Sequence, residues 1–295
     1  MNVRRITMVT ATATAALLMA TGTASAAPTT ETVYDTDLGI GKAWHTADTR
    51  PGGTLTWADT YGGALGKGAA VLSTPTGSAK VQLFTDAHDG TALSDITAVG
   101  YSTYQVAPVD GPQLPALNMR VDIDGDGDVD TYLVYEPYQD DEFYGNDAIE
   151  NGEWQDWDAW HAGESQWWAS HALAVPGCGQ ATPCTIDAIL AAHPTAVIRS
   201  GGNELRSGST PADADFDGSF GFNQGSGNTG VVGAADALHI ATQATTERPA
   251  TDVTYDFEST VTLAAKGDCK KGGWEASTNP VFRNQGDCVS HFAQK

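Results

Sequence analysis

Five aspartates alternate along one short run, and they are the residues of this chain best suited to bind a cation. They are Asp122, Asp124, Asp126, Asp128 and Asp130. Carboxylates this close together repel one another unless a cation neutralises them, and oxygen ligands at alternate positions are typical of calcium loops. Gly127 occupies the sixth position of the run, where such a loop turns sharply. We therefore predict a structural Ca²⁺ site formed by the five aspartates.

The similarity to an EF-hand loop ends before the loop would close. Position 12, where a bidentate glutamate completes the calcium shell, is Leu133. The residues from Thr131 to Tyr135 are mostly β-branched or aromatic and favour a strand. The run is therefore expected at the head of a strand, and an acidic turn without a metal is the alternative.

A cluster of tryptophans is the second feature that could bind a ligand. Five lie between residues 152 and 168: Trp154, Trp157, Trp160, Trp167 and Trp168. Exposed aromatic rings stack on sugars, so we take Trp154, Trp157 and Trp160 as candidate polysaccharide-binding residues. The alternative is core packing, because alternate residues of a strand point to opposite faces and part of the set must be buried.

Signatures of catalysis are largely absent, and we assign no catalytic residue. The chain contains no GxSxG elbow, HExxH helix or GxxxxGK phosphate loop. Carboxylates near the tryptophans, such as Glu136, Glu153 and Asp158, could include the pair that a glycoside hydrolase needs. The sequence does not fix the distance between any two of them, so a hydrolase stays the alternative to a binding protein.

The N-terminus and the charge indicate where the protein works. Residues 1–26 have basic Arg4 and Arg5, an apolar stretch and a small-x-small end at 24–26, which predicts a secretory signal peptide. No later stretch is long and apolar enough for a membrane span. The 15 basic and 37 acidic residues give a net charge of −22, which disfavours nucleic acid and anionic lipid as partners. We expect a secreted, extracellular protein, with attachment to the cell wall left open.

The four cysteines form two pairs that are local in the sequence. Cys178 lies close to Cys184, and Cys269 lies close to Cys288. In an exported chain an even number of cysteines predicts disulfides. Three connectivities are possible and proximity favours the local pairs, whereas zinc is disfavoured because neither pair has CxxC spacing.

Short runs rich in β-formers predict an all-β fold. The expected strands are 54–57, 79–84, 96–104, 116–121, 131–135, 196–199, 235–240 and 253–257. Runs of this length separated by Gly, Asp and Pro turns favour a β-sandwich or jelly roll. One short helix is expected after Thr185, which can cap it, and it should end at His193 before Pro194. Residues 200–219 and 242–252 are expected to be loops.

Five segments resemble a module that recurs in secreted bacterial surface proteins. They are YLVYEPY at 132–138, GEWQDWDA at 152–159, the Trp167–Trp168 pair, FNQGSG at 222–227 and TYDFE at 254–258. The resemblance implies a sandwich of lectin-like or carbohydrate-binding-module-like shape and no particular activity. We assign this domain to residues 30–258, followed by a linker at 259–268.

The C-terminal segment, 269–295, resembles a short cysteine motif of exported bacterial proteins. The matching residues are CKKGGW at 269–274, TNPVF at 278–282 and NQGDCVS at 284–290. A disulfide closing a loop of about 20 residues would contribute roughly 3 kcal/mol to a unit with little core. The exposed basic residues Lys270, Lys271 and Arg283 could contact an anionic wall polymer, although a structural cap is the simpler role.

The sequence therefore predicts a secreted, non-catalytic β-sandwich, stabilised by Ca²⁺ and two disulfides, that binds polysaccharide or another cell-wall component. The alternatives are a glycoside hydrolase on the same scaffold and a surface-display protein without a small ligand.

Overall fold

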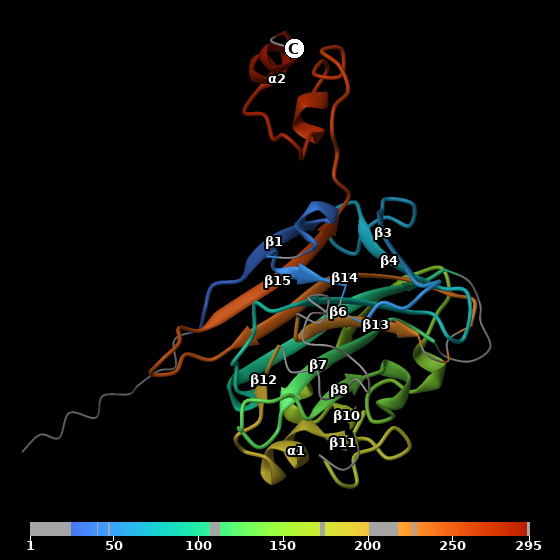
Figure 1. The fold of residues 1–295 in the computed structure, drawn as a ribbon, viewed down its shortest axis with the longest axis vertical. Helices are drawn as coiled ribbons and strands as arrows, with labels where there is room; N and C mark the ends of the chain where they lie inside the picture. The colour runs from blue at the N-terminus through green and yellow to red at the C-terminus, as the bar shows by residue number, and fades with distance from the viewer. Residues whose placement is uncertain are drawn as a thin grey trace, which may run out of the picture.

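Two β-sheets packed face to face form the body of the protein (Figure 1). The computed structural model describes residues 25–39, 41–46, 48–106, 113–171, 175–200, 218–225, 227 and 229–293. The predicted all-β sandwich is thus confirmed. The first 24 residues of the predicted signal peptide and most of the predicted loop at 200–219 lie outside the described residues.

The first sheet has seven strands. Its main path runs β1 (Thr29–Tyr34), β15 (Thr251–Glu258), β14 (Val231–Thr242), β4 (Ala69–Thr74) and β3 (Thr54–Ala58), and β6 (Ile96–Gln105) joins β14 to β9 (Trp154–Asp158). β1 runs parallel to β15, whereas the other pairs in this sheet are antiparallel.

The second sheet has eight strands and carries the features that matter for function. Its path runs β11 (Cys184–Thr185), β10 (Gln166–Ala169), β8 (Thr131–Tyr135), β7 (Ala116–Asp122), β13 (Phe220–Gly225), β5 (Lys80–Thr85) and β2 (Trp44–His45), with β12 (Val197–Ile198) paired to β7. β7 and β8 are hydrogen-bonded neighbours, so the aspartate run between them is the turn of a hairpin.

The alternation of side chains along β7 shows how the core is built. Leu117, Met119 and Val121 point into the sandwich and join one large apolar cluster. Asn118 and Arg120 occupy the intervening positions, so they belong to the outer face of the second sheet. β5 repeats the pattern, with Val81 and Leu83 in the core and Lys80, Gln82 and Phe84 at the alternate positions.

The described residues contain two α-helices and several short 3₁₀ turns. α1 (Ile186–Ala192) begins as predicted, since the Thr185 hydroxyl accepts a hydrogen bond from the amide of Ala188 at 3.2 Å, and it ends at His193. α2 (Gln285–Ala293) was not predicted and lies in the tail. The 3₁₀ turns are Asp35–Asp37, Leu93–Asp95, Pro137–Gln139, Asn146–Ala148, His161–Gly163 and Gly273–Ala276.

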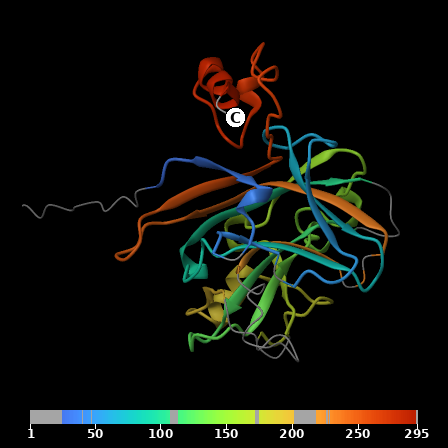
Figure 2. The same cartoon turned by 45° about the horizontal axis from the view of Figure 1, so that its top comes forward.

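Both predicted disulfides are present, Cys178–Cys184 and Cys269–Cys288. The second holds a small cluster of its own, in which Cys269 and Cys288 pack with Phe282 and partly buried Trp274. Figures 1 and 2 both show this tail apart from the sandwich, joined to it by a single connection after β15. No helix within the described ranges is long and apolar enough to cross a membrane.

Candidate binding cleft and calcium loop

The outer face of the second sheet is hollowed into a cleft of about 290 Å³. Strands β5, β7, β8, β10 and β13 supply most of its lining, together with residues from the neighbouring loops. The lining comprises Arg50, Lys80, Gln82, Leu114, Ala116, Asn118, Tyr132, Val134, Glu136, Tyr138, Trp168, Ser170, Gln180, Asn223 and Gly225. Polar and aromatic residues dominate this list. We call this surface the sheet-two cleft.

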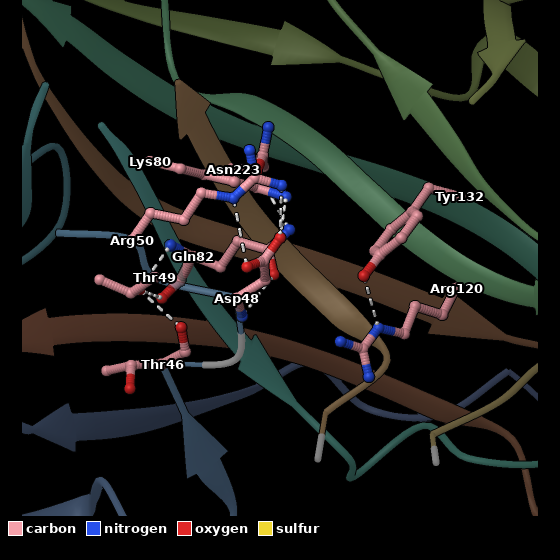
Figure 3. Close-up of polar contacts among 9 residues, drawn as sticks. All are labelled: Thr46, Asp48, Thr49, Arg50, Lys80, Gln82, Arg120, Tyr132 and Asn223. Atoms are coloured by element: carbon pink, nitrogen blue, oxygen red, sulfur yellow. Dashed lines mark hydrogen bonds and ion pairs between the residues drawn. The ribbon is translucent and has the colours of Figure 1, made fainter. Parts of the chain in front are cut away.

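An ion cluster of buried Asp48, largely buried Lys80 and exposed Arg50 lies at one end of the sheet-two cleft (Figure 3). The carboxylate of Asp48 lies 2.9 Å from Nη2 of Arg50 and 3.0 Å from Nζ of Lys80. Burial alone would raise the pKa of Asp48, but the hydrogen bond from Arg50 and the charge of Lys80 outweigh it and lower this pKa. Burial lowers the pKa of Lys80, and Asp48 opposes that change. Two cations thus share one carboxylate, which leaves the cluster with a net positive charge.

Amide side chains form the middle of the sheet-two cleft. Nε2 of Gln82 donates to Oδ1 of Asn223 at 3.0 Å, and the amide of Asp48 donates to Oε1 of Gln82 at 3.0 Å, which fixes the Gln82 side chain. Asn118 is only 4% exposed, and among the described residues its Oδ1 has no hydrogen-bond partner. Buried polar atoms are rarely left without a partner, so a ligand in the cleft could complete this one.

Tyr132 and Arg120 face each other across the β7–β8 ladder, where they are register partners. Nε of Arg120 donates a hydrogen bond to Oη of Tyr132 at 3.1 Å (Figure 3). The guanidinium also lies 5.4 Å from the centre of the Tyr132 ring, while Nζ of Lys80 lies 5.8 Å from the same ring. Two cations therefore flank one half-buried tyrosine that lines the cleft.

Aromatic rings and one carboxylate close the other end. Nε1 of Trp168 donates to Oε2 of Glu136 at 2.9 Å. Burial raises the pKa of Glu136, and hydrogen bonds from Tyr138 and Trp168 only partly offset the rise. Trp168 is half-buried, whereas its neighbour Trp167 points into the core and is fully buried.

The structure brings three of the five predicted calcium ligands together. Carboxylate oxygens of Asp122, Asp124 and Asp130 all lie within 4.8 Å of one another. Asp126 and Asp128 do not belong to this group and are exposed. Carboxylate oxygens grouped in this way suit a hard cation such as Ca²⁺, which takes six to eight oxygen ligands and would need backbone or water oxygens here as well.

Side chains of the run also fold the loop itself. The carboxylate of Asp122 accepts hydrogen bonds from the amides of Gly125 at 2.6 Å and Gly127 at 2.9 Å. Asp130 accepts one from the amide of Ile123 at 2.7 Å. Nε of Arg199, which follows β12, donates to the carbonyl oxygen of Gly127 at 3.0 Å. The loop is thus held both by its own aspartates and by the neighbouring strand.

The tryptophans proposed as ligand-binding residues lie elsewhere. Trp157 and Trp160 are each 4% exposed and belong to the core, which corrects the expectation of an exposed ring face at these two positions. Nε1 of Trp157 donates to the hydroxyl of Thr103 at 2.8 Å. Trp154 is half-buried beside Tyr104, and its indole N–H donates to the carbonyl of Tyr61. Strand β9 alternates between the two faces, and that alternation buries Trp157.

A larger cavity, of about 540 Å³, opens beside the N-terminal segment. Its lining includes Ala26, Ala27, His88, Arg248 and Tyr255. Burial lowers the pKa of His88 to about 4, so this histidine is neutral at physiological pH. Ala26 is the last residue of the predicted signal peptide, so cleavage there would alter the segment that forms one wall of this cavity. We therefore favour the sheet-two cleft as the candidate binding site.

A different arrangement of charges lies on the first sheet. Asp236 is fully buried and accepts hydrogen bonds from the amides of Leu65 at 2.8 Å and Phe257 at 3.1 Å. Burial raises the pKa of Asp236 to about 6. Asp256 and Glu258 lie nearby on β15, and Glu258 accepts from the amides of Lys67 and Gly68. We call Asp236, Asp256 and Glu258 the sheet-one acid cluster.

The residues of the sheet-two cleft were not singled out from the sequence, yet a signal for them exists. Lys80 and Gln82 alternate with apolar residues in β5, and Asn118 and Arg120 do so in β7. In a chain with only 15 basic residues, cations on the outer face of a strand are unusual enough to mark a site. Local sequence patterns do not predict the strand order that places β5, β13, β7 and β8 side by side.

No protein-family model, curated protein or solved structure matches this chain.

Proposed function

We propose that the protein is a secreted polysaccharide-binding protein whose sheet-two cleft binds an acidic glycan, and whose β7–β8 loop binds a structural Ca²⁺. The observation that carries the proposal is the cluster of Arg50, Lys80 and Arg120 at one face of a chain with a net charge of −22. Such a local reversal of sign attracts an anion and orients it before contact.

The rest of the cleft suits a sugar. Tyr138 and Trp168 provide flat apolar surface, and Asn118 and Asn223 provide amide groups for hydroxyls or carboxylates. The predicted secretion and the two disulfides agree with a partner outside the cell. The exposed Lys270 and Lys271 of the tail could add contact with a wall polymer, which stays a prediction.

Binding can be tested by titrating the protein with a polyuronate and, separately, with a neutral glucan. We expect the polyuronate to bind and its affinity to fall as salt rises, because the contacts are largely ionic. Arg50→Gln should weaken this binding about tenfold, since one charged contact is worth about 1.4 kcal/mol or more.

Two control variants make the titration decisive. Lys67→Gln removes the same charge beside the sheet-one acid cluster, and Trp154→Ala removes a ring from the originally predicted tryptophan site; both should bind as the wild type does. The proposal would be wrong if the polyuronate and the neutral glucan bound equally well. It would also be wrong if Lys67→Gln weakened polyuronate binding as much as Arg50→Gln does.

A further inference from the structure

The two ends of the sheet-two cleft carry charges of opposite sign, and a ligand that fills the cleft must match both. We propose that the cleft selects a glycan in which a uronate adjoins an N-acetylated amino sugar, a specificity that rests on the proposed function. The uronate carboxylate contacts Lys80 and Arg50, and the acetamido N–H donates a hydrogen bond to Glu136.

The cationic end has capacity for one carboxylate of the ligand. Arg50 and Lys80 share the carboxylate of Asp48, at 2.9 Å and 3.0 Å, so two positive charges face one negative charge. Lys80 belongs to β5, and its Nζ lies 5.8 Å from the centre of the Tyr132 ring, which belongs to β8. The ammonium and the ring thus approach each other above β13 and β7, the two strands between them. A ligand carboxylate above these strands would balance the charge of the cluster.

Glu136 gives the opposite end a hydrogen-bond acceptor. It directly follows β8, lines the cleft and is half-buried, and among the described residues it forms no ion pair. The side chains of Trp168, Tyr138 and Gln180 donate hydrogen bonds to it, the first at 2.9 Å. A carboxylate has about four acceptor sites, so it can still accept an N–H from a ligand. Burial raises the pKa of Glu136, and a further donor would stabilise its charged form.

The strand order sets the distance between the two ends. β5, β13, β7 and β8 are successive neighbours, so the backbones of Lys80 and Glu136 lie three strand spacings, or about 14 Å, apart across the sheet. Asn118 lies on β7 between them, and its buried Oδ1, without a partner among the described residues, suits a sugar hydroxyl. The cleft volume of about 290 Å³ is near the lower limit for ligand sites, which suits a short stretch of polymer.

An acetamido group matches the surroundings of Glu136 better than a free amine does. It donates an N–H but adds no positive charge, so the polymer keeps the net negative charge that Lys80 and Arg50 attract. Its methyl group can pack on the rings of Trp168 and Tyr138, which line the same end of the cleft. The expected ligand is therefore acidic at one sugar and acetylated at the next.

The first test compares two ligands on the wild-type chain. Hexasaccharides prepared from hyaluronate and from polygalacturonate are titrated into the protein in the same buffer with Ca²⁺. Hyaluronate alternates a uronate with an N-acetylated amino sugar, so its fragment carries half the charge of the other. Charge alone would favour polygalacturonate, whereas the hydrogen bond to Glu136 should make the hyaluronate fragment bind about tenfold more tightly.

Glu136→Gln tests the assigned acceptor. The variant keeps the shape of the side chain and an oxygen for Trp168, but a neutral acceptor forms a weaker hydrogen bond than a carboxylate does. The tenfold preference for the hyaluronate fragment should therefore disappear, while the melting temperature shows that the variant is folded. Glu153→Gln removes the same charge at an exposed position outside the cleft and should keep the preference.

Three results would overturn this specificity. They are tighter binding of the polygalacturonate fragment to wild type, an unchanged preference in Glu136→Gln, and tighter binding of the hyaluronate fragment after its acetyl groups are removed. In each case, weaker polygalacturonate binding in Arg50→Gln would leave the proposed function in place. If neither fragment bound to the wild-type chain, the specificity and the proposed function would both be wrong.

Discussion

The sheet-two cleft and the sheet-one acid cluster both bury charged groups, but they stabilise them in opposite ways. In the cleft, Asp48 is paired with the side-chain cations of Arg50 and Lys80. In the acid cluster, Asp236 is stabilised by the backbone amides of Leu65 and Phe257. Side-chain cations lower the pKa of Asp48, whereas the amides leave the pKa of Asp236 raised to about 6.

This difference shows which of the two can bind a ligand. Backbone amides that already bind carboxylates have no capacity left for an external anion. Cations that outnumber their carboxylate still attract one. We therefore regard the acid cluster as part of the structure that joins the Leu65–Gly68 loop to β14 and β15, and the cleft as the site.

The largest effect should come from titrating Asp236. Its pKa in the folded protein lies above its ordinary value, so the fold favours the neutral form and its contribution to stability is lost as pH rises from about 4 to about 6. Asp236→Asn cannot ionise. Between pH 4 and pH 7 its unfolding free energy should therefore gain about 3 kcal/mol relative to wild type.

Chemical unfolding at several pH values measures this difference directly, and the opposite titration of buried His88 cancels because both proteins contain it. The charge of Asp256 adds to the rise in the pKa of Asp236, and the charge of Glu258 raises the pKa of Asp256 in turn. Asp141→Asn, at an exposed site, should give a curve parallel to wild type. A parallel curve for Asp236→Asn would contradict the burial argument.

The second effect concerns calcium, which should stabilise the β7–β8 loop of the second sheet. If the loop binds Ca²⁺, an ion concentration one hundred times its dissociation constant adds about 2.7 kcal/mol, and EDTA should lower the melting temperature accordingly. Asp124→Asn, within the converging group, should remove most of this response. Asp128→Asn lies outside that group and should keep it.

A melting curve unchanged by EDTA would show that the aspartates form an acidic turn without a metal, the alternative given by the sequence. An equal loss in both variants would show that overall charge, and not convergence of three carboxylates, controls the response.

The smallest effect tests the ion cluster itself. Lys80→Met leaves Asp48 with Arg50 alone and should cost about 2 kcal/mol in urea unfolding, the range for a buried charged hydrogen bond. Arg50→Gln should cost less than about 1 kcal/mol, because the Arg50 side chain is 44% exposed. If both variants lost the same unfolding free energy, Lys80 and Arg50 would stabilise Asp48 equally, which would contradict the burial argument.

Much of the fold could be predicted from the sequence because its strands are short and strongly patterned. Thr131–Tyr135 was predicted with the bounds that the structure shows, and the Thr185 cap placed α1 correctly. Strands such as β4, rich in alanine, and β9, with two aspartates, carry weak β-propensity and were missed. They form because neighbouring strands pair with them.

The candidate site was only partly predictable. The aspartate run is contiguous, so its chemistry was evident, but the loop geometry that separates Asp126 and Asp128 from the other three was not. The cleft draws on residues from position 50 to position 225, and pairing of β5, β13, β7 and β8 brings them together. Such long-range pairing is not encoded in local patterns. The sequence also does not reveal that Trp157 and Trp160 are buried, and for this reason they were predicted as ligand-binding residues.

The hairpin formed by β7 and β8 connects the aspartate loop directly to the sheet-two cleft. Asp130, at the end of the loop, lies two residues before Tyr132, and Asp122 lies two residues after Arg120. Ion capture at the tip would therefore tighten the tyrosine–arginine pair directly below it. Under the calcium and glycan proposals, the affinity of the sheet-two cleft for its ligand would therefore depend on calcium bound at the loop.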